Sequence, residues 1–178
     1  MSELFSIQLQ NRQQQGRDGV WLDLPTTTEQ VQAALRQIGI SSDNPQGLFI
    51  SGYFAEEEKR FAIPYNMVLA SNVDELNFLA SRLETLSTGE RAELNAALQA
   101  PQSELFSIGR ITDFPENVDY YVHLPDVHGP AQLGDYYLNR SGMVDMPEEW
   151  KGGIDTAQFG RYVAQQEQGT FTQYGYLV

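Results

Sequence analysis

Residues 71–100, in the middle of the chain, carry two successive helical patterns that leave little choice of secondary structure. Asn72 is a favourable N-cap, and four leucines then recur at the spacing of one helical face: Leu76, Leu79, Leu83 and Leu86. Ser87 and Glu90 form a capping-box pattern that predicts a second helix, which must end before Pro101. We therefore expect a helical hairpin at the centre of the chain.

The N-terminal segment has strand patterns on both sides of a helix pattern. Residues 3–9 alternate between apolar and polar side chains, and residues 21–24 form a second short strand pattern. Thr26 with Glu29 matches a capping box and predicts the start of an amphipathic helix. Residues 48–53 are an apolar run suited to a buried strand. The sequence therefore predicts a β-β-α-β unit here.

The hexapeptide at residues 103–108 repeats residues 2–7 letter for letter. Nothing else in the two segments repeats, so we treat the match as a coincidence and expect two different structures. The first copy should be a strand. The second copy, with Ser103 available as an N-cap, should be a helical turn.

The rest of the C-terminal segment again mixes helix and strand patterns. We expect a strand at 119–124, a helix at 132–139, one turn at 147–150, a helix capped by Asp155 at 156–166 and a terminal strand at 170–177. We expect five glycines to lie in turns or helix caps: Gly152, Gly153, Gly160, Gly169 and Gly175. Together these patterns predict an α+β fold of three small domains: mixed α/β at 1–62, helical at 63–102 and mixed α/β at 103–178.

The chain carries 24 acidic and 11 basic residues, for a net charge of −13. Acids outnumber bases in every third: eight to five in residues 1–60, nine to three in 61–120, and seven to three in 121–178. Proteins that bind nucleic acid directly neutralise its phosphates with Lys and Arg, and this chain has no basic run. The composition therefore argues against direct binding of nucleic acid.

The sequence offers no motif for catalysis, cofactor binding or membrane insertion. It has no cysteine, no G-x-S-x-G, no P-loop and no G-x-G-x-x-G. His123 and His128 flank a turn and are more typical of a surface loop than of a metal site. It also lacks a run of about 18 apolar residues and a signal-peptide pattern. We expect a cytoplasmic protein that is not an enzyme, binds no metal or cofactor and contacts no membrane.

The order of motifs along the chain resembles that of the ArdA antirestriction family, which is carried by mobile genetic elements. The matching motifs are WLDLP at 21–25, FISGY at 49–53, VDELN at 73–77, LGDYY at 133–137, ID at 154–155 with FGR at 159–161, and GTFT at 169–172 with YGY at 174–176. These motifs span nearly the whole chain. Their order along the chain is more specific to the family than any single motif.

The resemblance implies an elongated, curved protein of three small domains that forms a homodimer through the third. It also implies surface carboxylates that imitate the phosphates of bent DNA and bind in the DNA-binding groove of a Type I restriction-modification enzyme. The candidate carboxylates are Glu56, Glu57, Glu58, Asp74, Glu75, Glu84, Glu90, Glu93, Asp113, Glu116, Asp119, Asp135, Asp145, Glu148 and Glu149. Since duplex DNA carries one charge per about 1.7 Å, a charge of −13 corresponds to roughly 22 Å of duplex.

Two other interpretations fit the same composition. An acidic adaptor or regulator could bind another basic DNA-processing protein, and competition with duplex DNA for a restriction enzyme would separate it from a DNA mimic. A hydrolase would need two buried carboxyl groups close together in a cleft, and no such pair stands out among so many acids.

Overall fold

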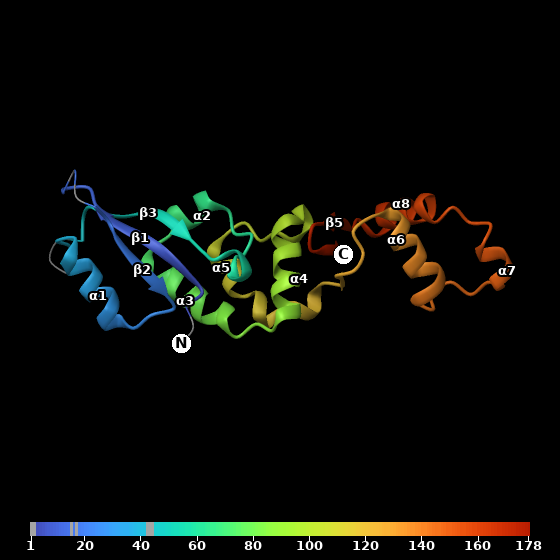
Figure 1. Ribbon diagram of the computed structural model, residues 1–178, viewed down its shortest axis with the longest axis horizontal. Coiled ribbons are helices and arrows are strands. Elements are labelled where there is room, and N and C mark those ends of the chain that lie inside the picture. The colour runs from blue at the N-terminus through green and yellow to red at the C-terminus, as the bar shows by residue number, and fades with distance from the viewer. Residues whose placement is uncertain (1–2, 15, 17, 42–44) are drawn as a thin grey trace. The chain divides into compact units, whose positions relative to one another are not determined.

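The computed structural model describes residues 3–178, apart from residues 15, 17 and 42–44. This part of the chain combines helices with antiparallel strands, so the predicted α+β class is confirmed (Figure 1). The elements group into two compact units: an N-terminal unit of Met1–Ser87 with Glu104–Glu116, and a C-terminal unit of Thr88–Ser103 with Asn117–Val178. The division into three domains stays a prediction.

A three-stranded antiparallel sheet forms one side of the N-terminal unit. Its strands are β1 (Phe5–Asn11), β2 (Val20–Leu24) and β3 (Leu48–Phe54), in the order β2-β1-β3, and α1 (Thr28–Gln37) connects β2 to β3. The predicted β-β-α-β unit is therefore confirmed. Alternate residues of β1 are buried, so Ile7 and Leu9 reach the core while Gln8 lies on the outer face of the sheet.

The N-cap of α1 is Thr27, one residue later than the predicted capping box of Thr26 and Glu29. The Gln30 backbone N–H donates to the Thr27 hydroxyl, and the Gln30 side chain accepts from the Thr27 backbone N–H, both at 3.4 Å. The reason for the shift lies in Asn77, whose amide pairs with the Thr26 backbone N–H and carbonyl at 2.7 and 3.0 Å. Because these bonds hold the Thr26 backbone outside the helix, the cap moves to Thr27.

Helices and short turns complete the core of the N-terminal unit. They are η1 (Glu57–Lys59), α2 (Tyr65–Leu69), α3 (Val73–Glu84), α5 (Ile108–Thr112) and η3 (Phe114–Glu116). The side chain of Asn72 caps α3 by accepting from the Glu75 N–H at 2.9 Å, as predicted. The leucine face of α3 is buried against α5 and β2. The predicted helix and its predicted apolar face are therefore both confirmed.

The C-terminal unit combines helices with a second small sheet. Its elements are α4 (Thr88–Gln99), η2 (Pro101–Ser103), η4 (Val118–Tyr120), β4 (His123–Leu124), α6 (Pro130–Asp135), the π-helical η5 (Tyr136–Arg140), α7 (Glu148–Lys151), α8 (Thr156–Glu167), β5 (Thr170–Thr172) and β6 (Gly175–Leu177). The strands follow the order β4-β6-β5. Both helices predicted within residues 71–100 are present, but α3 belongs to the N-terminal unit and α4 to the C-terminal unit.

The two copies of the repeated hexapeptide differ, as expected, but the second copy is not a helical turn. Ser103 ends η2, and its buried hydroxyl hydrogen-bonds the carbonyl oxygens of Ala97 and Ala100 at 2.5 and 2.8 Å. Glu104 then has a φ of +56°, so the chain leaves the right-handed helical region directly after Ser103. The next helix, α5, begins only at Ile108 and is capped by Ser107.

Two of the predicted C-terminal strands are wrong in extent. Within residues 119–124 only His123 and Leu124 form a strand, because Val118–Tyr120 form the turn η4. Val122 extends the pairing by exchanging two backbone hydrogen bonds with Val178, at 2.7 and 3.1 Å. Residues 170–177 form a hairpin of β5 and β6 in place of one strand. Gly175, with φ of +118°, makes the turn, and the Thr172 hydroxyl closes it by accepting from the Tyr174 N–H at 3.0 Å.

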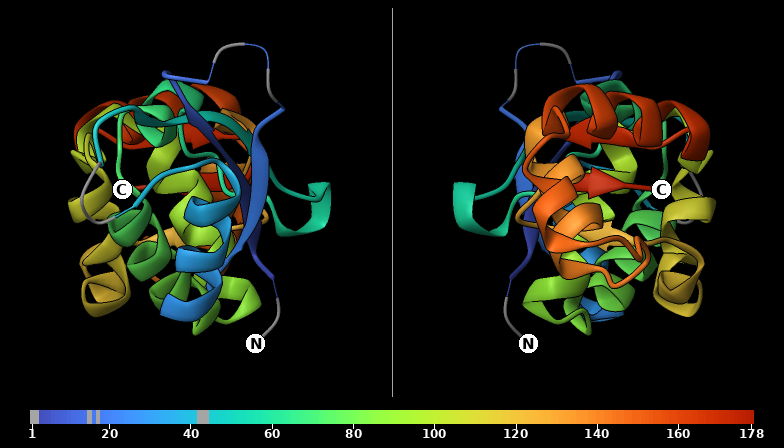
Figure 2. Two further views of the ribbon diagram at one scale, coloured as in Figure 1. Left: turned by 90° about the vertical axis from the view of Figure 1, so that its left-hand side faces the viewer. Right: turned by 90° about the vertical axis from the view of Figure 1, so that its right-hand side faces the viewer.

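Two glycines allow α6 and α8 to cross at very close range (Figure 2, right). A Cβ atom at Gly134 would lie 1.9 Å from the carbonyl oxygen of Thr156, and one at Gly160 would lie 1.8 Å from that of Pro130. The expectation that Gly160 is a turn or cap residue is therefore wrong, since it is a buried packing residue inside α8.

Candidate acidic binding surface

The fifteen candidate carboxylates are spread over both units and differ in exposure. Those that are exposed are Glu56, Glu57, Glu58, Asp74, Asp113 and Glu116 in the N-terminal unit and Asp119, Asp145, Glu148 and Glu149 in the C-terminal unit. Five are partly buried: Glu75, Glu84, Glu90, Glu93 and Asp135. Ten of the fifteen are thus available at the surface of their own unit.

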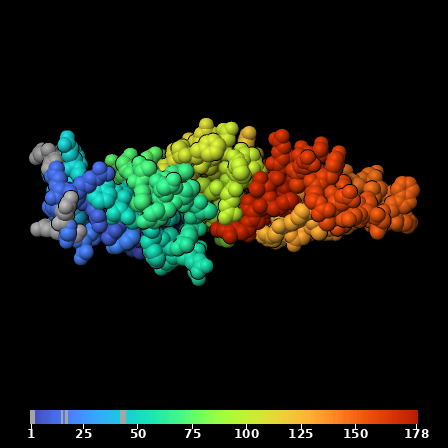
Figure 3. Space-filling model, turned by 90° about the horizontal axis from the view of Figure 1, so that it is seen from above, coloured from blue at the N-terminus to red at the C-terminus, as the bar shows by residue number. Residues whose placement is uncertain are grey.

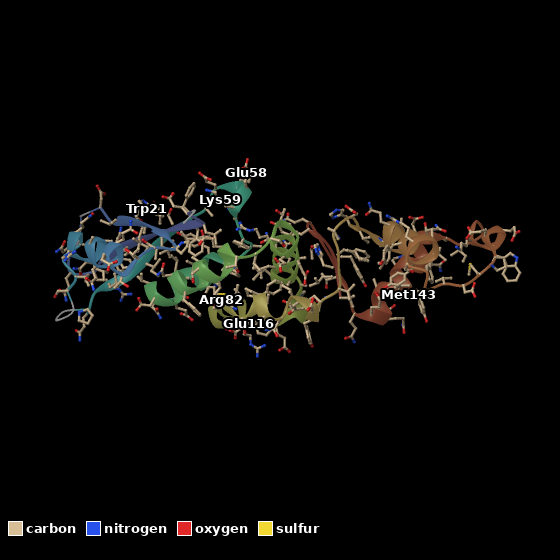
Figure 4. All side chains as sticks on the ribbon, turned by 90° about the horizontal axis from the view of Figure 1, so that it is seen from below. Trp21, Glu58, Lys59, Arg82, Glu116 and Met143 are labelled. Carbon is tan, nitrogen blue, oxygen red and sulfur yellow. The ribbon has the colours of Figure 1, made fainter. Side chains whose placement is uncertain are left out.

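Three consecutive glutamates form an acidic turn, Glu56–Glu58, directly after β3. The turn stands away from the sheet and is seen as the turquoise projection in Figure 2 (left) and Figure 3. Glu58 is at its tip, and Lys59 forms an ion pair with Glu56 at 3.0 Å (Figure 4). Because this pair is exposed, it contributes little to stability, and the turn can present its carboxylates to a partner.

Asp74 and Glu75 lie in the first turn of α3, where negative charge stabilises the exposed N–H groups of a helix start. Asp74 is exposed and Glu75 is partly buried. A role in starting α3 therefore accounts for this pair, whether or not it also contacts a partner.

Besides Glu56, three candidates are already paired with a cation. Arg82 contacts Glu116 at 2.7 Å (Figure 4), Arg140 contacts Asp135 at 3.1 Å, and Lys151 contacts Glu148 at 2.6 Å. A basic partner would have to exchange these internal pairs for new ones. Their net contribution to binding is therefore smaller than that of an unpaired exposed acid.

Glu93 differs most from a solvated carboxylate. Burial, followed by the nearby charges of Glu90 and Asp119, raises the pKa of Glu93 to about 7. Its Oε1 atom is buried and has no hydrogen-bond partner among the described residues. At neutral pH the group is therefore about half protonated, and it is a poor substitute for a phosphate.

Two exposed acids of the N-terminal unit, Glu3 and Asp23, are absent from the candidate set. They line a groove of about 410 Å³ together with Trp21 and the start of α1. The sequence held a usable indication, because alternation along a strand places Trp21 and Asp23 on the same face.

The two histidines of the described part of the chain lie in different surroundings. His123 belongs to β4, and its Nε2 atom lies 2.7 Å from the carbonyl oxygen of Tyr174, while His128 is exposed. Among the described residues, no three His, Asp or Glu side chains are grouped so as to hold a metal ion.

Glu93 has the raised pKa that a carboxyl acid catalyst would need. The grooves found in the N-terminal unit, however, are lined by other residues. Glu93 lies in the C-terminal unit with its acidic neighbours Glu90 and Asp119. No described helix is both long and apolar enough to span a bilayer.

A family model described as antirestriction protein (ArdA) matches residues 15–178. No curated protein matches the chain.

Proposed function

The chain belongs to the ArdA antirestriction family, and from this membership we propose that it inhibits Type I restriction-modification enzymes by binding in their DNA-binding groove. In this proposal its carboxylates take the places of DNA phosphates. The protein acts as an inhibitor without catalysis or cofactor, in the cytoplasm, and does not bind nucleic acid itself.

The observation that carries the proposal is the exposure of ten candidate carboxylates in both units, nine of them within or at the ends of helices and turns and one, Asp145, in the segment before α7. A groove that binds DNA is lined with Lys and Arg and gains affinity from each anion that it neutralises. Carboxylates that are fixed on helices and turns need no ordering at the moment of binding. The protein also avoids the bending energy that DNA requires in many complexes.

We further propose that the protein is a homodimer joined through residues 103–178. Support comes from large apolar side chains exposed in this segment, namely Met143, Trp150 and Tyr162. Exposed aromatic and Met side chains are typical of subunit contacts. Sedimentation velocity at micromolar protein should give a dimer, and a monomer throughout this range would contradict the proposal.

The inhibitor proposal is tested by titrating the protein into a Type I restriction-modification enzyme bound to a labelled DNA site. We expect the DNA to be displaced at near-stoichiometric protein. Polyglutamate at the same total charge is the control, and it should displace far less because its charges are not fixed in space. No displacement at micromolar protein would contradict the proposal and favour an acidic adaptor for a different basic protein.

A further inference from the structure

An exposed indole lies across the outer face of the N-terminal sheet. Trp21 on β2 is opposite Gln8 on β1, and Gln8 is opposite Gly52 on β3. A Cβ atom at Gly52 would lie 3.0 Å from the Cη2 atom of Trp21. The indole therefore extends over the sheet as far as Gly52, and a larger residue at position 52 would crowd it. It remains 50% exposed, so one part of the ring is held by the sheet while the rest is open to a partner.

Trp21 is also one of the residues that line a groove of about 410 Å³. Glu3 and Asp23 supply two carboxylates to the groove, and Thr26, Thr27 and Gln30 supply hydroxyl and amide groups. The carboxylate of Asp23 is oriented by the hydroxyl of Ser6, which donates to it at 2.5 Å. Among the residues that the structure describes, no Lys or Arg lines the groove. The groove thus combines an aromatic face with uncompensated negative charge.

We propose that this groove, here called the Trp21 groove, receives an arginine side chain of the basic partner. A guanidinium is planar and can stack on an indole while its N–H groups bind a carboxylate at the edge. A phosphate or another anion would be repelled by Glu3 and Asp23, and an apolar side chain would leave both carboxylates without a partner. The identification of the partner as a restriction-modification enzyme rests on the proposed function.

The Trp21 groove would contribute to binding differently from the phosphate-mimicking acids. Long-range attraction between exposed charges weakens as salt screens them. Stacking on Trp21 acts only at contact and changes no formal charge when it is removed. The two contributions can therefore be separated by measuring affinity at several salt concentrations.

The first experiment compares Trp21→Ala, Trp21→Phe and Phe106→Ala in the displacement assay with the restriction-modification enzyme. Trp21→Ala should weaken binding by roughly three- to thirty-fold with an unchanged salt dependence, since cation–π stacking is lost but charge is kept. Trp21→Phe should retain part of the affinity. Phe106 is also exposed in the N-terminal unit but lies outside the groove, so its replacement should have no effect. If the wild type displaces DNA and Trp21→Ala binds as well as Phe106→Ala, the groove proposal is overturned while the inhibitor proposal stands.

The second experiment tests arginine binding in the groove without the restriction enzyme, so it also applies when the wild type displaces no DNA. The ¹⁵N-labelled protein is titrated with the peptide acetyl-Gly-Arg-Gly-amide, and with the same peptide carrying norleucine in place of Arg. The Trp21 indole N–H resonance, assigned with Trp21→Phe, should shift with the arginine peptide only, and the shift should shrink in Asp23→Asn. In that case the inhibitor proposal fails and the groove remains an arginine site for another basic protein. No shift with either peptide would overturn the groove as well.

Discussion

At the scale of single residues, the structure separates acids that differ little in the sequence. Glu93 and Glu149 are both surface candidates by sequence, yet burial and two neighbouring acids raise the pKa of Glu93 to about 7, while Glu149 is exposed. The folded protein therefore holds a proton on Glu93 that the unfolded chain releases at much lower pH. Glu93 should weaken the fold as pH rises, and its charge should contribute to a complex only under alkaline conditions.

We expect Glu93→Gln to be more stable than the wild type at pH 8 and equally stable at pH 4. The unfolded carboxyl group has a pKa near 4.5 and the folded one near 7. Wild-type stability is thus fully present below 4.5 and falls as pH rises through 7, a loss that glutamine does not share. After discounting for partial exposure, the gain at pH 8 is about 1 to 2 kcal/mol. Urea unfolding at both pH values measures it, with Glu149→Gln as the control, and an equal effect of Glu93→Gln at pH 4 and pH 8 would refute the assignment.

At the scale of elements, the closest packing in the C-terminal unit is the crossing of α6 and α8. Each helix contributes one glycine, Gly134 or Gly160, and each glycine faces a backbone carbonyl oxygen of the other segment. A backbone oxygen cannot rotate away as a flexible side chain can. The two helices therefore hold this distance only with glycine at both positions.

Replacing Gly160 with Ala should destabilise the C-terminal unit by about 3 kcal/mol, because the new methyl group would force α6 and α8 apart. Gly152→Ala is the matched control, since a Cβ there meets nothing within 4 Å and φ is −62°. It should change stability by less than about 0.5 kcal/mol. Thermal unfolding followed by circular dichroism compares the two, and equal melting temperatures would show that the crossing tolerates a side chain.

Local patterns predicted the elements well where the chain supplies its own caps and periodic apolar residues. Asn72 and Asp155 cap α3 and α8 as expected. The three strands of the N-terminal sheet lie where the alternation of residues 3–9, the short pattern at 21–24 and the apolar run at 48–53 predicted them. The errors arose from distant contacts. The bond of Asn77 to Thr26 moves the cap of α1, and the strand that pairs with β4 is β6, far along the chain. No local pattern contains such information.

At the scale of the whole molecule, the sequence predicted where negative charge would be abundant but not which acids are free to act. Ten of the candidate acids are exposed at the surface. Glu116, Asp135 and Glu148 form ion pairs with the side chains of Arg82, Arg140 and Lys151. The aromatic groove at Trp21 was missed because its lining combines Glu3, which precedes β1, with residues of β2, of α1 and of the segment between them. Position along the chain does not reveal such combinations.

Neutralising the acidic turn with Glu56→Gln, Glu57→Gln and Glu58→Gln should weaken binding to a Type I enzyme about tenfold at low salt. Each exposed charge contributes about 0.5 kcal/mol, so one substitution alone should change affinity by about twofold. The triple variant should also bind with a smaller salt dependence. Asp18→Asn, Glu29→Gln and Asp126→Asn remove the same charge at exposed positions outside the candidate set. Equal losses from the two triple variants would show that net charge alone sets the affinity.

The proposal that this protein competes with DNA for one groove is best examined through the affinity of the protein–enzyme complex, measured by calorimetry over a range of NaCl and duplex DNA concentrations. If the carboxylates replace phosphates, the apparent Kd should rise in proportion to the DNA concentration, and log affinity should fall linearly with log salt, as it does for DNA itself. An apparent Kd that is the same with and without saturating DNA would mean that protein and DNA bind the enzyme together, and it would contradict DNA mimicry.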